Sequence, residues 1–422
     1  MGKAQEIIER DKKVISPSLT REYEFVFQKA KDCYVWDADG KKYLDFAGGV
    51  AVANVGHTNN KVVRAIKKQL KYGLHCGFSD FYAELPVRFV ETLLKLVPAH
   101  LNTAFLSNSG TESVECAYKL ARWHSKKKNC IAFKPSFHGR TMGALSLTNS
   151  RPVHKERFGP FMPVVHSPYP YCYRCPFKKA RPCELQCLTS LKNLIRKTRD
   201  VAAIFFEPIA GESGYIAPPK DFVHGLRETC DKYNILLCID EVQSGCFRTG
   251  KFLAIENFDV SPDIVSLSKA IGGGLPIGVT LANKEVMDWS AGSHANTFGG
   301  NLLACAAGIA VLNFMAEKRL GENAKRMGDY TLNRLKEMQQ EYEIIGDVRG
   351  IGLMIGIELV KNRQTRACAI EERKKIIEGA LKQGLLLLPA GESTIRICPP
   401  LTITKDEINK GLDILEEAIK FI

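Results

Sequence analysis

Two residues of this sequence, Asp240 and Lys269, each follow a short apolar run that has the length of a buried strand. Asp240 comes after residues 235–239, and Lys269 follows residues 263–268 and precedes Gly272-Gly273-Gly274. A partly buried carboxylate needs a cation as its partner, and a protonated ring nitrogen is such a cation. A lysine whose pKa is lowered can form a Schiff base with a bound cofactor. Taken singly, Asp240 can also be a helix cap and Lys269 a surface charge.

The segment Ser109-Gly110-Thr111 has the composition of a small-residue turn at the start of a helix. It follows the apolar run 103–107 and precedes an amphipathic stretch that extends toward Ser125. The free N–H groups and positive dipole of a helix N-terminus bind phosphate, and the Thr111 hydroxyl can add a hydrogen bond. An ordinary helix cap explains the segment equally well. No Gly-Lys-Ser/Thr pair follows, so one phosphate fits better than a nucleotide.

The elements that must position these residues alternate in type between about residues 101 and 283. Short apolar runs and helix-like stretches follow one another, which is typical of an α/β fold with a mainly parallel sheet. Polar residues follow five of the apolar runs, and ligands of open α/β sheets bind beyond those strand ends. We therefore expect the polar residues to form one site. The predicted strands are residues 103–107, 129–134, 201–206, 235–239, 263–267 and 279–282.

The last hundred residues have a different pattern, with a helix-like stretch at 301–318 and strand-like residues at 348–360. We expect them to form a smaller α+β domain together with the N-terminal part of the chain. The predicted division is an N-terminal segment, residues 1–70, a large domain, residues 71–310, and a C-terminal small domain, residues 311–422.

The composition excludes several classes of protein. The 422 residues are 45% hydrophobic and 25% charged, which is typical of globular proteins and excludes a wholly disordered chain. The net charge of +13 is spread along the chain without a recognition motif, so we expect anionic small molecules rather than nucleic acid as partners. The apolar runs are too short to span a bilayer and no targeting segment is visible, so we expect a soluble, cytoplasmic protein.

The motifs around Asp240 and Lys269 resemble those of one enzyme family. Asp240-Glu-Val-Gln-Ser-Gly and Ser268-Lys-Ala-Ile-Gly-Gly-Gly-Leu-Pro-Ile-Gly are similar to the class III aminotransferases of the 4-aminobutyrate, ornithine and acetylornithine type. The similarity extends from about residue 44 to residue 402, and Lys269 follows Asp240 by 269 − 240 = 29 residues. It implies the fold of the fold-type I pyridoxal-phosphate enzymes. It also implies pyridoxal phosphate as cofactor, Lys269 as its Schiff-base residue and Asp240 as the partner of its pyridinium.

The resemblance also implies cofactor contacts for residues in other segments. Ser109, Gly110 and Thr111 resemble the phosphate loop of the family. Phe137 would stack on the pyridine ring with His138 beside it, and Gln243 would reach the ring hydroxyl. Glu207, with Glu212, resembles the family's pair of glutamates. Thr297 resembles the residue that crosses from a neighbouring subunit to the phosphate, which implies a homodimer with shared active sites.

Substrate contacts follow from the same resemblance. Arg140 would hold a substrate carboxylate, for which a guanidinium fork is suited. Arg396 resembles the family's switching arginine, paired with Glu212 in one half-reaction and released to bind a carboxylate in the other. Val50 stands where the ornithine enzymes tend to have Tyr, which favours a simple ω-amino acid such as 4-aminobutyrate as donor and 2-oxoglutarate as acceptor.

Other functions remain open at this point. Ornithine, acetylornithine or lysine aminotransferases and amino-acid racemases share many of these motifs. A non-catalytic binding protein is a more distant alternative, because Lys269 and Asp240 are both present. Gly350-Ile-Gly352-Leu-Met-Ile-Gly356 resembles a nicotinamide-binding motif, but its third glycine is one place too far along.

A cluster of four cysteines lies outside the catalytic motifs. Cys172, Cys175, Cys183 and Cys187 occupy an insert of the large domain, residues 169–188, that is rich in Pro, Arg and Lys. Four thiolates at this spacing can bind zinc, form two disulfides, or remain free thiols in a loop. The sequence leaves these three alternatives open.

Overall fold

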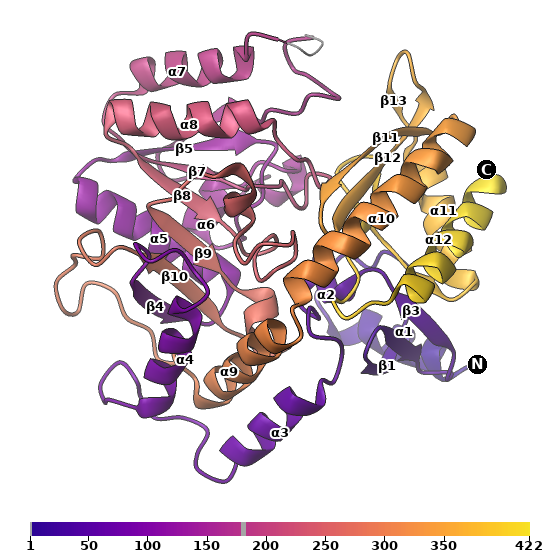
Figure 1. Ribbon diagram of the computed structural model, residues 1–422, viewed down its shortest axis with the longest axis horizontal. Helices are drawn as coiled ribbons and strands as arrows, with labels where there is room; N and C mark the ends of the chain where they lie inside the picture. Colours follow the sequence, from indigo (N-terminus) through magenta and orange to yellow (C-terminus); the bar gives the residue numbers. More distant parts are fainter. Residues whose placement is uncertain (1, 179–182) are drawn as a thin grey trace.

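Three β-sheets organise the chain in a computed structural model that describes residues 2–178 and 183–422 (Figure 1). The largest sheet has seven strands in the order β4-β10-β9-β8-β7-β5-β6. Only β10 among them runs antiparallel to its neighbours, which confirms a mainly parallel sheet. The strands are β4 (Thr103–Ser107), β5 (Asn129–Lys134), β6 (Val164–Pro168), β7 (Val201–Phe206), β8 (Leu236–Asp240), β9 (Ile264–Leu267) and β10 (Gly278–Ala282).

All six predicted strands are present, with ends that agree to within one residue, but β6 was not predicted. Its residues Val164–Pro168 include a histidine, a serine and a proline, so the apolar run is only two residues long. The strand forms because it pairs in parallel with the buried strand β5. Its existence therefore depends on a tertiary contact rather than on a local pattern.

Helices cover both faces of this sheet. Phe205 faces one side and lies 6.2 Å, between ring centroids, from Tyr118 of α5, whereas Phe206 faces the other side and lies 6.1 Å from Phe222 of α8. This alternation is the two-residue period of a strand, and it explains why all six residues of β7 are buried. In Figure 1, α7 and α8 lie side by side. The helices are α5 (Gly110–Ser125), α6 (Met142–Leu147), α7 (Gln186–Thr198) and α8 (Lys220–Tyr233).

The two smaller sheets are built from the chain ends. The four-stranded sheet β1-β2-β3-β14 contains strands from both ends of the chain, and the five-stranded one has the path β11-β12-β16-β15 with β13 paired to β12. Both termini lie on the same side of the molecule (Figure 1). The limits of the predicted domains stay predictions. The strands are β1 (Phe27–Lys31), β2 (Tyr34–Asp37), β3 (Lys42–Asp45), β11 (Ile345–Ile351), β12 (Met354–Asn362), β13 (Ala367–Cys368), β14 (Leu385–Leu386), β15 (Leu388–Ala390) and β16 (Thr394–Ile397).

The remaining helices connect and cover these sheets. Over residues 2–178 and 183–422, none of the helices has the length and apolar composition that crossing a bilayer requires. The helices are α1 (Lys3–Val14), α2 (Gly48–Ala51), α3 (Asn60–Gln69), α4 (Glu84–Leu94), α9 (Leu302–Glu317), α10 (Leu320–Glu341), α11 (Ile370–Lys382) and α12 (Lys405–Lys420).

Candidate active site

The polar segments beyond the strands of the seven-stranded sheet meet at one cavity of about 290 Å³. Most of the residues that line it were singled out in the sequence, which confirms that the strand ends share one edge. Its lining is formed by Gly110, Thr111, Phe137, His138, Gly139, Arg140, Glu207, Ile209, Asp240, Val242, Gln243, Ser244 and Lys269.

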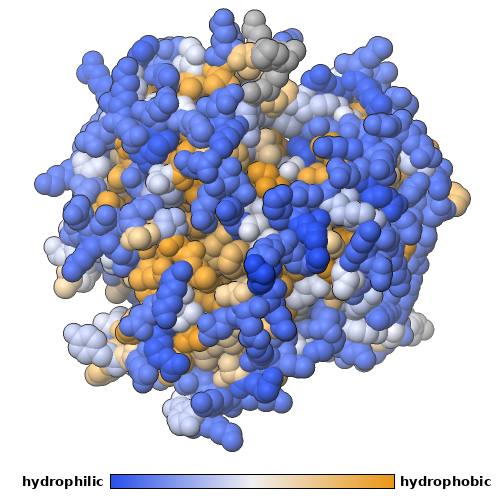
Figure 2. Space-filling model, viewed as in Figure 1, coloured by the Kyte–Doolittle hydropathy of each residue, from blue (hydrophilic) through white to orange (hydrophobic). Residues whose placement is uncertain are grey.

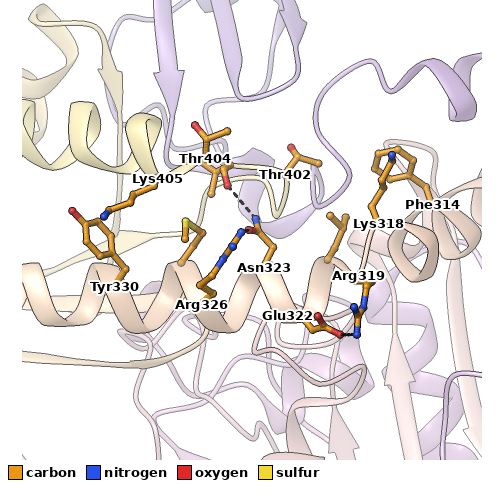
Figure 3. A pocket seen from close by; sticks show the side chains of 13 residues that line it. Phe314, Lys318, Arg319, Glu322, Asn323, Arg326, Tyr330, Thr402, Thr404 and Lys405 are labelled. Carbon is orange, nitrogen blue, oxygen red and sulfur yellow. Dashed lines mark hydrogen bonds and ion pairs between the residues drawn. The ribbon is translucent and has the colours of Figure 1, made fainter.

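A larger cavity, of about 820 Å³, lies elsewhere, between α10 and the segment before α12 (Figure 3). Its polar side chains are largely engaged with one another or with the backbone. Arg319 pairs with Glu322 at 2.7 Å, and Asn323 donates hydrogen bonds to the backbone carbonyls of Leu401 and Ile403. None of the predicted site residues lines it. Cavity size alone therefore does not identify the functional site.

Lys269 follows β9 and lies on the wall of the smaller cavity. Its backbone has φ = 48°, in the left-handed region that a residue with a β-carbon adopts only at a cost. Burial lowers the pKa of Lys269 below its usual range, although the carboxylates of Glu212 and Asp240 act in the opposite direction. A lysine with a lowered pKa supplies more of the free amine that nucleophilic attack requires.

Asp240 and His138 form a buried pair at the base of the cavity. His138 Nδ1 lies 2.8 Å from Asp240 Oδ2, and Asp240 Oδ1 accepts a hydrogen bond from the N–H of Val242 at 3.0 Å. Burial acts to lower the pKa of His138, but the hydrogen bond to Asp240 and its charge outweigh burial, so the pKa is raised. Asp240 therefore favours the protonated form of His138.

Glu207 fixes the loop that carries Phe137. Its two carboxylate oxygens accept hydrogen bonds from the N–H of Phe137 at 2.8 Å and of Gly211 at 2.9 Å. Burial raises the pKa of Glu207 to about 7, although His138 acts to lower it. Glu207 therefore connects the strand ends of β5 and β7 at the cavity.

The start of α5 lies against the same cavity. Ser109 caps the helix by accepting the N–H of Glu112 at 3.3 Å, so its side chain does not line the cavity. Gly110 and Thr111 occupy the first turn, where N–H groups lie outside the helical hydrogen-bond ladder. A β-carbon on Gly110 would come within 2.6 Å of Val242 Cγ1, so only glycine fits between α5 and the segment after β8.

Arg396 and Glu212 form an ion pair, with Nη1 2.7 Å from Oε1. Gln243 also donates to Glu212, at 3.4 Å. Burial acts to raise the pKa of Glu212, but Arg396 and Lys269 lower it to about 2. Burial likewise opposes the charge of Arg396, and Glu212 outweighs it, so the pKa of Arg396 is raised. Both groups are therefore ionised at neutral pH.

Arg140 lies exposed at the edge of the cavity, with its guanidinium 5.7 Å from the ring centroid of Phe137. It donates to His154 Nε2 at 3.3 Å, and the other ring nitrogen of His154 lies 3.0 Å from Ser150 Oγ. Since the arginine donates, His154 Nε2 is the acceptor and Nδ1 carries the proton. Burial, Arg140 and Arg151 lower the pKa of His154.

Five predicted cofactor and substrate residues do not line this cavity: Ser109, Glu212 and Arg396, which are described above, and Val50 and Thr297. Val50 is in the left-handed region, with φ = 59°, and is not among the residues that line the cavity. Thr297 is exposed, next to the exposed Phe298, and also does not contribute to the cavity of its own chain. The roles of both residues stay predictions.

Other residues at the site were missed in the sequence. Val242 and Ser244 belong to the same motif as Asp240. Because they closely follow the predicted strand 235–239, the sequence could have indicated that they line the cavity. Ile209 follows Glu207 in the same way. His154 gave no signal, because it lies in a short 3₁₀ turn (Pro152–His154) without a recognisable pattern around it.

The four cysteines of the insert show no metal geometry. In the described part of the chain, no group of three or more His, Cys, Asp or Glu side chains is arranged to hold a metal ion. The described cysteines also form no disulfide. Burial raises the pKa of Cys187 to about 11, and Cys183 and Cys172 are near enough to add to this effect. The choice among zinc, disulfides and free thiols stays open.

The residues of the small cavity fit pyridoxal phosphate. The buried Gln243 Oε1 and His138 Nε2 have no hydrogen-bond partner within the described residues, so polar atoms are available to a ligand. Asp240 offers a carboxylate to a protonated ring nitrogen, the first turn of α5 offers N–H groups to a phosphate, and Lys269 offers an amine to a carbonyl. These three features match the ring nitrogen, the phosphate and the aldehyde of this cofactor.

Comparison with known proteins places the chain in a family. The protein-family model described as aminotransferase class-III matches residues 16–419 of this chain. The chain is 40% identical to the leucine/methionine racemase of Thermococcus litoralis, covering 98% of this chain and 95% of that protein. It is 38% identical to the acetylornithine aminotransferase of Clostridium acetobutylicum, covering 94% and 97%.

A solved structure agrees with this result. The taurine:2-oxoglutarate aminotransferase from Bifidobacterium kashiwanohense, in complex with PLP and glutamate, has a TM-score of 0.93 at 28% identity, over 100% of this chain and 98% of that one. The predicted fold, enzyme class and cofactor are thereby confirmed. The chain belongs to the class III aminotransferases, which are pyridoxal-phosphate enzymes.

Proposed function

We propose that the protein transfers an amino group from an ω-amino acid, with 4-aminobutyrate as the first candidate, to 2-oxoglutarate by a ping-pong mechanism. The observation that carries this proposal is the ion pair between Arg396 and Glu212 at 2.7 Å. While the pair is closed, Arg396 is neutralised and Arg140 is the arginine available to a carboxylate. A donor whose carboxylate lies far from its reacting amine suits this state.

The acceptor half-reaction needs a different state of the same pair. A 2-oxo acid carries a carboxylate beside the reacting carbon, and 2-oxoglutarate carries a second one at its far end. Release of Arg396 from Glu212 would let it bind the first carboxylate, while Arg140 binds the second. A guanidinium suits both tasks because its planar fork matches a carboxylate.

The chemistry would use few residues. When bound, pyridoxal phosphate supplies an electron sink and carries the amino group between the half-reactions. Gly110 and Thr111 would hold the phosphate, and Asp240, supported by His138, would hold the ring nitrogen in its protonated form. The amine of Lys269 would take a proton from the reacting substrate carbon and deliver one to the cofactor carbon that carries the carbonyl.

Racemisation is the second candidate, because one relative at 40% identity is a leucine/methionine racemase. A racemase needs a carboxylate contact beside the reacting carbon in every turnover, whereas the closed Arg396–Glu212 pair blocks that contact. Acetylornithine is a further possible donor, since it also carries a carboxylate far from its reacting amine and one relative acts on it.

A half-reaction screen tests the proposal. Purified holoenzyme is mixed with 4-aminobutyrate, ornithine, acetylornithine, lysine or alanine, and loss of the yellow colour is followed spectrally. We expect the fastest loss with 4-aminobutyrate and recovery on addition of 2-oxoglutarate. Loss of optical activity from a single amino acid without net amino transfer would overturn the proposal in favour of racemisation.

The attachment residue has its own test. Borohydride reduction of the holoenzyme, followed by peptide mapping, should find the cofactor on Lys269, and Lys269→Ala should abolish turnover. Labelling of a different lysine would overturn this assignment.

A homodimer with shared active sites is also part of the proposal. Figure 2 shows hydrophobic side chains gathered on one face, over the region where Figure 1 draws α4 and α9. Exposed apolar patches of this kind mark protein interfaces. In this dimer, Thr297 would reach the phosphate of the partner's site. The cytoplasmic location of the protein stays a prediction. The exposed side chains near these elements are Leu70, Tyr72, Leu74, Phe81, Tyr82, Val87 and Phe298.

A further inference from the structure

The cysteine-rich insert begins with a tyrosine-rich segment that connects the seven-stranded sheet to the five-stranded one. At one end, the Tyr169 hydroxyl donates to the backbone carbonyl of Glu207 at 2.9 Å, and its ring stacks on Phe206 with centroids 5.4 Å apart. Two residues later, the Tyr171 hydroxyl donates to Glu358 of β12 at 2.7 Å. The segment therefore contacts the cofactor side of the molecule and the small sheet within three residues.

Glu358 is a buried carboxylate, 3% exposed, that is shared by several segments. From the insert, Tyr171 and Arg174 Nε donate to it, the latter at 2.8 Å. Arg349 of β11 donates at 2.7 Å and Thr394 of β16 at 2.8 Å. A buried carboxylate with this many donors holds the segments that supply them in one arrangement.

The strand register relates Glu358 to the substrate ion pair. Glu358 pairs with Thr394, and the next pair on the same face is Gly356 with Arg396. Glu358 therefore lies beside the strand segment that presents Arg396.

Arg349 completes the connection on the other side of that pair. Besides Glu358, it donates to Thr394 Oγ1 at 3.1 Å and to the backbone carbonyl of Gly214 at 2.6 Å. Gly214 follows Glu212 by two residues. One cluster thus fixes the backbone on both sides of the Arg396–Glu212 pair.

We infer that Tyr171 and Arg174 of the insert are positioning residues for substrate carboxylate binding, acting through Glu358 on the segments that carry Arg396 and Glu212. This inference rests on the proposed function for the identity of the carboxylate ligand. Loss of either insert contact leaves Glu358 with fewer donors and lets Thr394 and Arg349 shift. Arg396 then meets the carboxylate in a less favourable arrangement.

The chain offers a matched control for this inference. The Tyr173 hydroxyl is buried and has no hydrogen-bond partner within the described residues, although it lies on the same segment as Tyr171. Tyr171→Phe removes a hydrogen bond to Glu358, whereas Tyr173→Phe removes a hydroxyl without one. Arg174→Met and Arg174→Lys form a second pair, since lysine keeps the charge beside Glu358.

The experiment measures the two half-reactions of each holoenzyme separately by spectral change. For Tyr171→Phe and Arg174→Met we expect the 2-oxoglutarate concentration at half-maximal rate to rise roughly five- to tenfold, which is a part of the cost of a lost hydrogen bond to a charged group, because the effect reaches Arg396 through Glu358. The maximal rate and the amino-donor half-reaction should change less than about twofold. Arg174→Lys should recover most of the loss, and Tyr173→Phe should resemble the wild type.

Three outcomes would overturn the inference: equal weakening of both half-reactions, a lower maximal rate at unchanged half-saturation, or an equal effect of Tyr173→Phe. Calorimetric titration of each holoenzyme with glutarate, a dicarboxylate that cannot react, keeps the test independent of turnover. If the wild type does not react with 2-oxoglutarate, the proposed function fails. The inference then stands or falls on whether Tyr171→Phe weakens glutarate binding relative to Tyr173→Phe.

Discussion

Two Arg–Glu pairs lie near one another at the five-stranded sheet, Arg396–Glu212 and Arg349–Glu358, and each has a closest N–O distance of 2.7 Å. Their surroundings differ. Glu358 accepts hydrogen bonds from Arg349, Arg174, Tyr171, Ser393 and Thr394. Glu212 accepts one short bond, from Arg396, and a long one from Gln243 at 3.4 Å. The buried Nε of Arg396 has no partner within the described residues.

The difference indicates that the Arg396–Glu212 pair can open, whereas the Arg349–Glu358 pair stays closed. Breaking a buried pair leaves an uncompensated charge, which is strongly destabilising unless another ion replaces the lost partner. At Arg396 a substrate carboxylate can be that replacement, and the Glu212 side chain is 24% exposed, so water can reach it. At Glu358, whose side chain is 4% exposed, neither a replacement ion nor water is available. Under the proposed function, the same two residue types would serve substrate binding in one place and stability in the other.

The largest expected effect is the loss of stability on removal of the Glu358 carboxylate. Glu358→Ala leaves Arg349 and Arg174 without their shared partner, and we expect a loss of about 3–5 kcal/mol in the free energy of unfolding. Glu212→Ala should lose clearly less, because its site is partly open to water. Urea unfolding of both variants, followed by circular dichroism at one protein concentration, checks this. Similar losses for the two variants would contradict the comparison.

Replacing each arginine by lysine should separate stability from binding. Arg349→Lys cannot keep the contacts to Gly214, Glu358 and Thr394 together, so we expect about 2 kcal/mol less stability. Arg396→Lys should unfold at nearly the wild-type urea concentration but need about tenfold more 2-oxoglutarate for half-maximal rate. Urea unfolding and the 2-oxoglutarate concentration at half-maximal rate are measured for both variants, so that each variant is the control for the other. A reversed pattern would show that the two pairs have been assigned the wrong tasks.

Removal of the negative charge of Glu212 from the Arg396–Glu212 pair should affect the two half-reactions unequally. Glu212→Gln leaves Arg396 without its counter-charge while the donor is bound, so we expect the amino-donor half-reaction to weaken by about tenfold. The 2-oxo acid half-reaction should change less, because there the substrate neutralises Arg396. Single-turnover spectra with 4-aminobutyrate and with 2-oxoglutarate measure the two halves. Equal losses would count against the switch.

The acid limb of stability should give the smallest effect. Arg396 and Arg349 lower the pKa values of Glu212 and Glu358 to about 2 from the ordinary 4.5, against the opposing effect of burial. A lowered carboxyl pKa stabilises the fold above pH 4.5, and the contribution is lost as the pH falls toward 2. Because the two pKa values are lowered equally, Glu358→Gln and Glu212→Gln should each flatten the plot of unfolding free energy against pH between these limits to a similar extent. A variant whose acid limb has the slope of the wild type would contradict this expectation.

The cofactor cavity could be predicted from the sequence because its residues follow strands that have a local apolar pattern. Lys269, Asp240 and Glu207 each come directly after such a run, and the parallel sheet brings the ends together. The resemblance to the family added the roles that the pattern alone does not give. Val50 does not line this cavity, and Thr297 is expected to reach the cavity of the partner subunit, so the roles of both residues stay predictions.

The Glu358 cluster could not be predicted in the same way. Tyr171 and Arg174 lie 187 and 184 residues from Glu358 in the sequence, and no local period relates them. One signal was available: Glu358 stands alone as a charged residue in the otherwise apolar run 354–360, with a burial pattern that is continuous through it. A charge in such a run needs partners, but the sequence does not say which residues supply them.

The backbone conformation of Lys269 lowers the stability of the fold. A residue with a β-carbon at φ = 48° is less stable than glycine in the same conformation, by about 1 kcal/mol. Selection for stability alone would favour glycine at this position, but glycine has no side-chain amine that could react with a cofactor carbonyl. The chain therefore has a less stable backbone conformation at the position that presents an amine to the cavity.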